Sequence, residues 1–248
     1  MDAASTRPNV SDELRRLREL DACAVSDALD SLGLGGVVAG IGPLWPAGRL
    51  FGTVRTVALR PVVAGEPPSG THLGATAIDT ATAGDVIVVA NQGRVDSAAW
   101  GGLLSAAAAR KGVAGVIVDG ACRDVDEAAG AGLAVFARAA TPISARGRSV
   151  EEATDAPVEI GGVRVATGDL VVADASGVVF VQSDSANEVL EVAERIVEKE
   201  RSMLHELSAG APVQAVLDGR YETMLRGERG SLTQTGSEGR EGDAHAVD

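Results

Sequence analysis

Two short apolar runs, residues 85–90 (DVIVVA) and 114–119 (AGVIVD), lie on either side of an alanine-rich segment, residues 97–112. Apolar runs of this length predict buried strands, and the segment between them predicts a helix. A strand, a helix and a second strand in this order form a crossover, which is typical of parallel strands. The sequence therefore predicts an α/β fold in which helices cover a parallel or mixed sheet.

Further elements of both kinds follow from local patterns. Helices are predicted over residues 11–20, 21–33, 71–84 and 184–209. Strands are predicted over residues 49–60, 158–165, 169–174 and 177–182, and residues 33–48 are expected to be a loop. Gly161 and Gly162 divide residues 158–165 into a hairpin, and Ser185 and Glu188 indicate a capping box at the start of the last helix.

Length and composition favour one large globular domain. Hydrophobic residues make up 45% of the chain and aromatic residues only 2%, so the core is expected to consist of Val, Ala, Leu and Ile. We expect a flexible N-terminus over residues 1–10, a single domain over 11–229 and a disordered tail over 230–248.

Charge and cysteine content exclude several classes of function. A net charge of −13 disfavours nucleic acids and anionic membranes as partners. No apolar run approaches the roughly 18 residues that a membrane span needs. Cys23 and Cys122 lack CxxC spacing, which argues against a disulfide framework and a structural zinc site. A reducing, cytoplasmic location is expected.

Common catalytic groups are scarce. There is no GxSxG elbow for a serine hydrolase, and the glycines around Gly35 do not open a nucleotide-binding βα unit. The only lysines are Lys111, in a last helical turn, and Lys199, between two glutamates, so an imine mechanism is disfavoured.

Arg123 and Asp124 follow the strand predicted over residues 114–119. The carboxyl end of such a strand is where α/β proteins bind ligands. There Arg123 can bind a carboxylate through two hydrogen bonds, and Asp124 can give an oxygen to a hard cation. The alternative is a surface salt bridge or a helix N-cap, and the two interpretations have similar weight on these residues alone.

A second feature favours the ligand site. Trp100, Gly101 and Gly102 are expected at the N-terminus of the helix over residues 97–112, where free backbone N–H groups can bind an anion. The alternative is that the glycines allow close packing of the helix on the sheet.

The last helix carries a third feature. Val189, Ala193, Ile196 and Met203 lie on one apolar stripe, and Glu200 occupies the stripe between Ile196 and Met203. A carboxylate in an apolar stripe needs a partner, so Glu200 is expected to meet a cation or another subunit.

Together these segments resemble the family of class II 4-hydroxy-4-methyl-2-oxoglutarate / 4-carboxy-4-hydroxy-2-oxoadipate aldolases and RraA-like proteins. The resemblance covers roughly residues 20–210, and its most specific block is WGGLLSAAAARKGVAGVIVDGACRD, residues 100–124. It implies an αββα sandwich of mixed sheets, of the swivelling-domain type, assembled into trimeric rings or stacked hexamers with active sites between subunits.

The resemblance also implies roles for single residues. Arg123 would bind the substrate carboxylate, and Asp124 would bind Mg²⁺ or Mn²⁺. The backbone N–H groups of Leu103 and Leu104, after Gly101 and Gly102, would bind the keto acid. Glu200 of a neighbouring chain would hold metal-bound waters.

One position departs from the family pattern. Active aldolases of the family commonly carry D-X20-R-D, and Gly102 stands at the position of the first Asp. Aldol cleavage needs a group that takes the C4 hydroxyl proton, whereas decarboxylation of oxaloacetate needs only enolate stabilisation. Gly102 is therefore compatible with decarboxylation and argues against aldol turnover, the choice between the two reactions stays open, and Asp96 or His72 are candidate replacements for the base.

The leading hypothesis is a divalent-metal-dependent lyase that cleaves a small 2-keto acid to pyruvate enolate, by aldol cleavage or decarboxylation. One alternative is a non-catalytic RraA-like regulator of ribonuclease activity, with its acidic surface against a basic partner. Asp124 argues against this alternative, because such regulators tend to lose that acid. Another is a lyase scaffold recruited to a specialised biosynthetic pathway.

Overall fold

The computed structural model describes residues 10–66 and 72–217. The strands are β1 (Val37–Val38), β2 (Gly42–Pro43), β3 (Leu50–Pro61), β4 (Asp85–Trp100), β5 (Gly115–Cys122), β6 (Ala134–Ala140), β7 (Ser149–Thr154), β8 (Val158–Ile160), β9 (Val163–Val165), β10 (Leu170–Asp174) and β11 (Gly177–Val181). The helices are α1 (Val10–Leu17), α2 (Ala22–Leu32), α3 (Ala75–Thr80), α4 (Gly102–Lys111), α5 (Val125–Gly130), α6 (Ala186–Ser208) and α7 (Val213–Val216).

Most strands belong to one mixed sheet. Among the described residues it has nine strands, in the order β1-β11-β10-β3-β4-β5-β6-β2 with β7 on β3, and β8 and β9 form the separate hairpin that the two glycines predict. In this sheet β3 pairs with β4, β4 with β5 and β5 with β6, and these three pairings are parallel. The other pairings between its described strands are antiparallel. The predicted crossover from β4 through α4 to the parallel strand β5 is confirmed.

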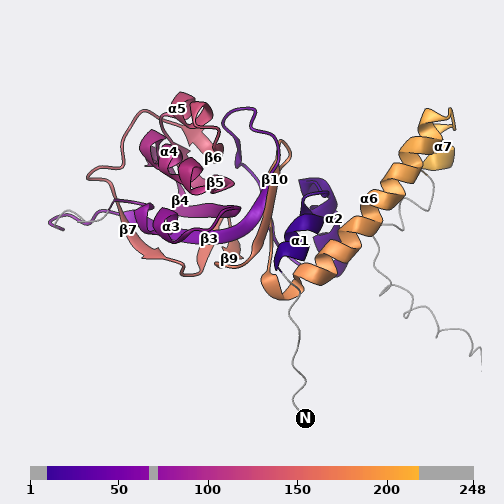
Figure 1. Cartoon of the computed structure of the whole chain (residues 1–248), viewed down its shortest axis with the longest axis horizontal. Coiled ribbons are helices and arrows are strands. Elements are labelled where there is room, and N and C mark those ends of the chain that lie inside the picture. The colour runs from indigo at the N-terminus through magenta and orange to yellow at the C-terminus, as the bar shows by residue number, and fades with distance from the viewer. Residues whose placement is uncertain (1–9, 67–71, 218–248) are drawn as a thin grey trace, which may run out of the picture.

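The sheet is folded so that it supplies two layers. Side chains from β4, β5 and β6 meet side chains from β1, β10 and β11 in one buried cluster that includes Val88, Ile117, Phe136, Val171 and Phe180. Helices α3, α4 and α5 cover the outer face of β4 and β5, and α1, α2 and α6 cover β10 and β11 (Figure 1). The predicted αββα layering is confirmed, with both inner layers drawn from a single sheet.

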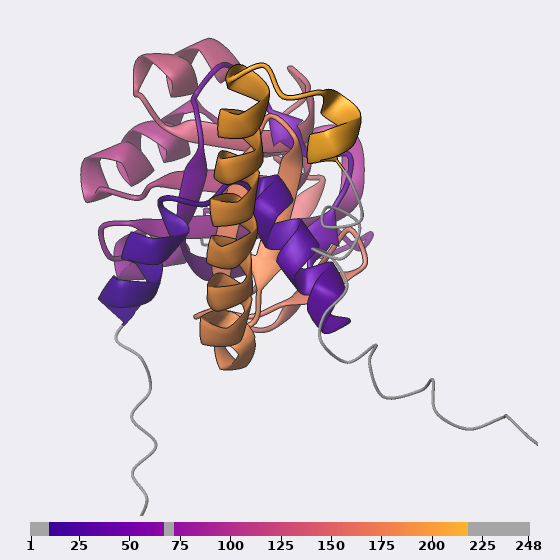
Figure 2. The same ribbon diagram turned by 90° about the vertical axis from the view of Figure 1, so that its right-hand side faces the viewer.

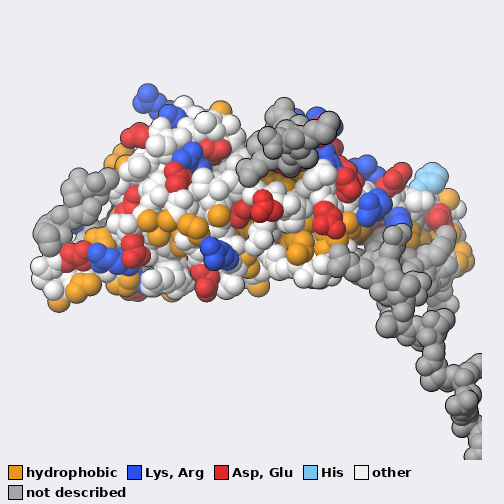
Figure 3. Space-filling model, turned by 90° about the horizontal axis from the view of Figure 1, so that it is seen from below, with side chains coloured by type: hydrophobic (Ala, Val, Ile, Leu, Met, Phe, Trp, Pro, Cys, Tyr) orange, Lys and Arg blue, Asp and Glu red, His pale blue; other side chains and the backbone are white. Residues whose placement is uncertain are grey.

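Helix α6 is the longest helix and extends past the body of the domain (Figure 1). Its first half packs on the sheet beside α1 and α2 (Figure 2), with Val189, Ala193 and Ile196 buried as the stripe predicts. Its second half projects with α7, and hydrophobic side chains are visible on this projecting end (Figure 3). Leu204 and Val213 there are 61% and 60% exposed. None of the helices in the described part of the chain is long and apolar enough to cross a bilayer.

The predicted helix over residues 97–112 begins too early. Strand β4 continues to Trp100, because Ala98 and Trp100 pair with Ala121 and Cys122 of β5, and the helix begins at Gly102. Alanine favours helices, but this pairing buries the segment from Ser97 to Trp100 in the sheet.

Three smaller predictions also need correction. The Ser185 hydroxyl donates to the Gln182 carbonyl and makes no capping bond, because residues 183–185 form a 3₁₀ turn before α6. The expected loop over residues 33–48 contains β1 and β2, which extend the two ends of the sheet. The helix expected over residues 71–84 is only the six-residue α3. The tail expected over residues 230–248 lies outside the described residues, as does the N-terminus up to residue 9.

Candidate active site

Arg123 and Asp124 occupy the predicted place, directly after β5 ends at Cys122. The backbone N–H of Arg123 donates to the carbonyl of Trp100 at 3.0 Å, which joins the ends of β4 and β5. Asp124 has a φ of 55°, in the left-handed region that residues other than glycine seldom adopt. This uncommon backbone conformation lies at the start of α5 and is often associated with functional sites.

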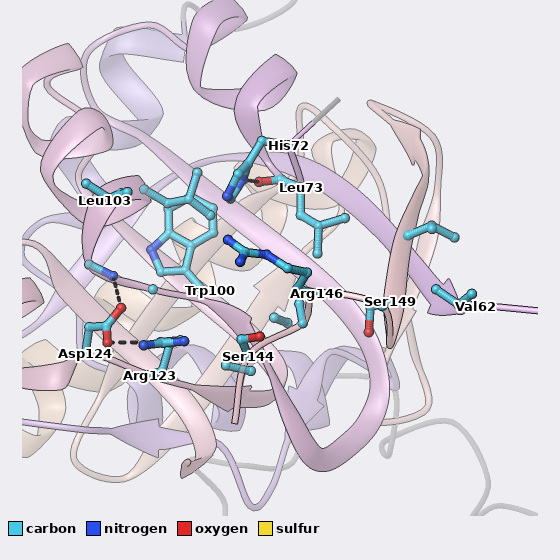
Figure 4. Close-up of a pocket in the computed structure, with 18 of the residues that line it drawn as sticks. Val62, His72, Leu73, Trp100, Leu103, Arg123, Asp124, Ser144, Arg146 and Ser149 are labelled. Carbon is cyan, nitrogen blue, oxygen red and sulfur yellow. Dashed lines mark hydrogen bonds and ion pairs between the residues drawn. The ribbon is translucent and has the colours of Figure 1, made fainter. Parts of the chain in front are cut away.

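The Asp124 carboxylate does not cap its own helix. Its Oδ2 accepts a hydrogen bond from the Gly102 backbone N–H at 3.0 Å, and its Oδ1 accepts one from Arg123 Nε at 3.0 Å (Figure 4). The Gly102 N–H and, after it, the Arg123 guanidinium lower the pKa of Asp124 below its usual value, against the opposing effect of burial. Asp124 is therefore an anion at neutral pH, with lone pairs left for a cation.

The glycines at the start of α4 let this helix approach the Arg123–Asp124 pair. A Cβ on Gly101 would lie 3.0 Å from both Arg123 Cγ and Asp124 Oδ2. A Cβ on Gly102 would lie 3.0 Å from the Asp124 Cβ and 3.1 Å from the Glu127 Cβ. The glycines thus permit a close approach, but the contacts are with Arg123, Asp124 and Glu127, which lie after β5 and on α5, and not with the sheet as the alternative interpretation expected.

The first turn of α4 also leaves donors for a ligand. Gly102 N–H is bonded to Asp124, and Ser105 N–H is bonded to the Gly101 carbonyl. The N–H groups of Leu103 and Leu104 belong to the first turn and have no intrahelical acceptor. Both residues line the same cavity as Arg123 and Asp124.

This cavity has a volume of about 780 Å³. Its lining comes from the segments after β3 and before α3, the end of β4, the start of α4, the segment after β5, the loop between β6 and β7, and the start of β7. The lining residues are Val62, Glu66, His72, Leu73, Ala98, Ala99, Trp100, Gly101, Gly102, Leu103, Leu104, Arg123, Asp124, Ser144, Ala145, Arg146, Gly147, Ser149 and Val150.

Trp100 forms a buried wall of the cavity. Its indole Nε1 donates to Ser105 Oγ at 3.0 Å, and this hydroxyl donates to the Gly101 carbonyl at 3.1 Å. A Cβ on Gly74 would lie 2.9 Å from the Trp100 ring, so the segment with His72 passes close to it. Glu151 holds this segment by accepting the Gly74 N–H at 2.6 Å.

The two candidate bases are placed differently. His72 lines the cavity and lies on the same side of it as Trp100 in Figure 4. Asp96 is absent from the lining, its side chain is 67% exposed, and it pairs with Arg94 at 3.3 Å. Of these two, only His72 is placed to take a proton from a ligand in the cavity.

Glu200 lies on α6, on the side of the domain away from α4 and α5 (Figure 1), and is absent from the lining. Burial, followed by the charges of Asp21 and Asp27, raises the pKa of Glu200. This direction agrees with the cost expected for a carboxylate in an apolar stripe. Its proposed contact with a neighbouring chain remains a prediction, as does the assembly of subunits that the contact requires.

Sequence reasoning missed Arg146, Glu66 and Ser144. They lie in connections without a strong pattern, so no signal in the sequence separated them from other loop residues. Arg146 reaches the cavity only because the β6–β7 loop lies over the end of β4. A hydrogen bond of 2.8 Å from the Ala98 N–H to the Ile143 carbonyl holds the loop there.

The Aldolase/RraA family model, described as RraA-like, matches residues 22–180, which include β5, the Arg123–Asp124 pair and the start of α4. The chain belongs to the RraA-like family. The predicted resemblance is confirmed.

Individual relatives of this RraA-like chain carry different names. A protein of Halalkalibacterium halodurans named "Putative 4-hydroxy-4-methyl-2-oxoglutarate aldolase" is 32% identical over 185 residues, 74% of this chain and 83% of that protein. Protein DlpA of Legionella pneumophila is 32% identical over 79% of this chain, which spans only 31% of DlpA. The structure of Streptomyces coelicolor RraAS2, an unusual member of the RNase ES inhibitor RraA family, has a TM-score of 0.70 at 27% identity, covering 82% of this chain and 98% of RraAS2.

Proposed function

We propose that this RraA-like protein is a divalent-metal-dependent lyase that cleaves the C3–C4 bond of a small 2-keto acid and releases pyruvate enolate. The observation that carries this proposal is the Arg123–Asp124 pair, which lies beside the N-terminus of α4 and lines a cavity of about 780 Å³. The backbone N–H of Gly102 holds the Asp124 carboxylate in place. The relative named as an aldolase supports the same class of reaction.

The residues present fit Mg²⁺ or Mn²⁺. Asp124 is a single carboxylate whose pKa is lowered, so at neutral pH it can supply a hard oxygen ligand. Mg²⁺ suits such a site, because it keeps several waters and accepts few protein ligands. We propose Asp124 as the direct ligand and Glu200 of a neighbouring subunit, in a trimer or hexamer, as a partner of the bound waters. When bound, the cation is a Lewis acid that stabilises negative charge on the keto oxygen.

The chain's own groups bind and orient the substrate. Arg123 donates to the C1 carboxylate, and the N–H groups of Leu103 and Leu104 donate to the oxygens where negative charge grows as the C3–C4 bond breaks. The electron pair of that bond moves into the C2–C3 enolate, which then takes a proton at C3. Trp100 and Leu73 give this region apolar walls.

The fate of C4 distinguishes two reactions. In decarboxylation C4 leaves as CO₂, and no group has to remove a proton first. In aldol cleavage the C4 hydroxyl must lose its proton, and Gly102 lacks the carboxylate that the family places there. We propose decarboxylation as the better-supported reaction, with His72 as the base if aldol cleavage occurs.

Pyruvate release tests the proposal. The protein is assayed with oxaloacetate and with 4-hydroxy-4-methyl-2-oxoglutarate, in Mg²⁺, in Mn²⁺ and after EDTA treatment. We expect metal-dependent release above the background of the free metal. No such release from either substrate would remove the lyase proposal.

A ribonuclease regulator is the second candidate. The similarity to RraAS2 and the net charge of −13, which suits a basic protein partner, favour it. A lyase-inactive protein that inhibits a ribonuclease in a purified RNA-cleavage assay would support this function instead.

A further inference from the structure

The cavity beside Arg123 and Asp124 is much larger than a four-carbon keto acid. Its volume is about 780 Å³, within the range of about 300–1,000 Å³ in which proteins enclose ligands of drug size. Oxaloacetate has three carbon–carbon bonds of about 1.5 Å each, so its carbon chain spans less than about 5 Å. A ligand of this size fills only a small part of the cavity.

The remaining part of the cavity extends along the edge of the sheet, away from Asp124. Asp124 follows β5, whereas Val62 follows β3 and Val150 lies on β7. Strand β3 pairs with β4 on one edge and with β7 on the other, and β4 pairs in turn with β5. Because neighbouring strands lie about 4.8 Å apart, β7 and β5 are separated by roughly 14 Å. Figure 4 shows Val62 on the side of the cavity away from Asp124.

Apolar side chains line this end of the cavity. Val62, Leu73 and Val150 define it, and it is called the distal pocket below. Val150 is buried, and so is the ring of Trp100, which lies between Asp124 and Leu73 in Figure 4. An apolar group bound in the distal pocket would leave water and contact apolar side chains, which favours binding.

Two polar side chains at this end of the cavity already have partners. Arg60 donates to both oxygens of Glu66, at 2.9 and 2.5 Å, and this pairing lowers the pKa of Glu66 to about 2. The Ser149 hydroxyl accepts a hydrogen bond from Arg94 Nη1 at 3.2 Å. Arg146 is exposed at the cavity, and its planar guanidinium can stack on an aromatic ring. The distal pocket therefore suits an apolar group, and an aromatic ring in particular.

We propose that the cavity binds a 2-keto acid whose distal end carries an apolar substituent, such as an aromatic ring, in the distal pocket. This inference rests on the proposed function for the position of the keto-acid end beside Arg123 and Asp124. Oxaloacetate is then the core of a larger substrate. Val62 and Leu73 determine specificity and take no part in proton transfer.

Binding of two keto acids that differ by one phenyl group tests the inference without turnover. Isothermal titration calorimetry in Mg²⁺ compares 2-oxo-4-phenylbutanoate with 2-oxobutanoate. The wild-type protein is expected to bind the phenyl compound at least about tenfold more tightly, because its ring leaves water for the distal pocket. Val62→Ser and Leu73→Ala remove apolar surface from this pocket. Each should reduce the preference about threefold or more and leave the affinity for 2-oxobutanoate unchanged.

Two control variants separate the possible causes. Val63→Ser makes the same change as Val62→Ser at the next residue, which is 64% exposed and absent from the cavity lining, and should leave both affinities unchanged. Arg123→Gln should weaken both keto acids alike, because they share the keto-acid end.

Three results would overturn the inference. The wild-type protein could show no preference, as expected if a neighbouring subunit fills the distal pocket. The preference could survive in both Val62→Ser and Leu73→Ala. It could also fall in Val63→Ser as much as in Val62→Ser, which would place the ring outside the cavity. Failure of the lyase proposal has another signature, namely no metal-dependent cleavage of any keto acid assayed while the preference for the phenyl compound persists.

Discussion

The carboxylate of Asp124 and the backbone N–H of Gly102 are joined by a hydrogen bond of 3.0 Å, which connects the end of β5 to the start of α4. The acid is oriented by a helix terminus, and no side chain at residue 102 intervenes. A substitution at Asp124 or at Gly102 should therefore change the orientation or the charge of the carboxylate at the candidate site.

Asp124→Asn should abolish metal-dependent turnover with little loss of stability. Asparagine can still accept the Gly102 N–H but carries no charge for a cation. We expect kcat/KM to fall about 100-fold or more and Tm to change by less than about 4 °C. Pyruvate release and differential scanning calorimetry measure the two effects. The control Asp126→Asn, at an exposed residue of α5, should leave both unchanged, and full activity of Asp124→Asn would contradict the assignment.

Arg123→Lys should raise KM while the protein stays folded. Lysine keeps the positive charge but cannot form two parallel hydrogen bonds with a carboxylate. We expect KM for oxaloacetate to rise about tenfold in steady-state assays. Arg110→Lys, in the last turn of α4 and outside the cavity lining, is the matched control. An unchanged KM would show that Arg123 does not bind the substrate.

Gly102→Asp should shift the balance of reactions towards aldol cleavage at some cost in stability. The new Cβ would lie 3.0 Å from the Asp124 Cβ and 3.1 Å from the Glu127 Cβ, so both neighbours must move by a few tenths of an ångström. We expect destabilisation of about 1–3 kcal/mol. Urea unfolding measures it, with Gly102→Ala as the steric control. The ratio of aldol to decarboxylase activity should rise in the Asp variant only.

Activity lost between pH 7 and 5 should not come from Asp124. Its pKa is lowered, so protonation occurs below the usual value of 3.8, and the stability from its hydrogen bonds is lost only as the pH falls through that lower pKa. The free energy of unfolding in urea checks this: the difference between the wild-type protein and Asp124→Asn should stay constant from pH 7 to pH 5 and change only as the pH falls through the lowered pKa. A difference that already changes between pH 7 and pH 5 would contradict the lowered pKa.

Glu200→Gln should stabilise the isolated chain at neutral pH. The pKa of Glu200 is raised, so its charged form destabilises the fold as the pH rises above the usual value of 4.5, and the effect is complete above the raised pKa. We expect Tm at pH 7 to rise by about 1–3 °C, with no gain at pH 4. Glu198→Gln, an exposed residue on the same helix, is the control. A lower Tm at pH 7 would show that the Glu200 charge has a stabilising partner.

Local sequence patterns were sufficient for most of the fold. The apolar runs that became β4 and β5, the glycine pair between β8 and β9, and the stripe on α6 are each a pattern within one short segment of the sequence, although the contacts of these segments are long-range. For the same reason the position of Arg123 and Asp124 at the end of a strand could be predicted. Trp100 was misplaced because its pairing with Cys122 outweighs the helix preference of the alanines around it.

By itself, then, the sequence determined the α/β class, the family, the Arg123–Asp124 pair and the glycines beside it, because each is encoded in a short continuous segment. The tertiary structure alone decided that Arg146 and His72 share their cavity, that Asp96 does not, and that Glu200 lies on the opposite side of the domain. These relations depend on which distant segments a folded sheet brings together. Hydrogen bonds such as that between Ala98 and Ile143 form only once the long-range pairing exists.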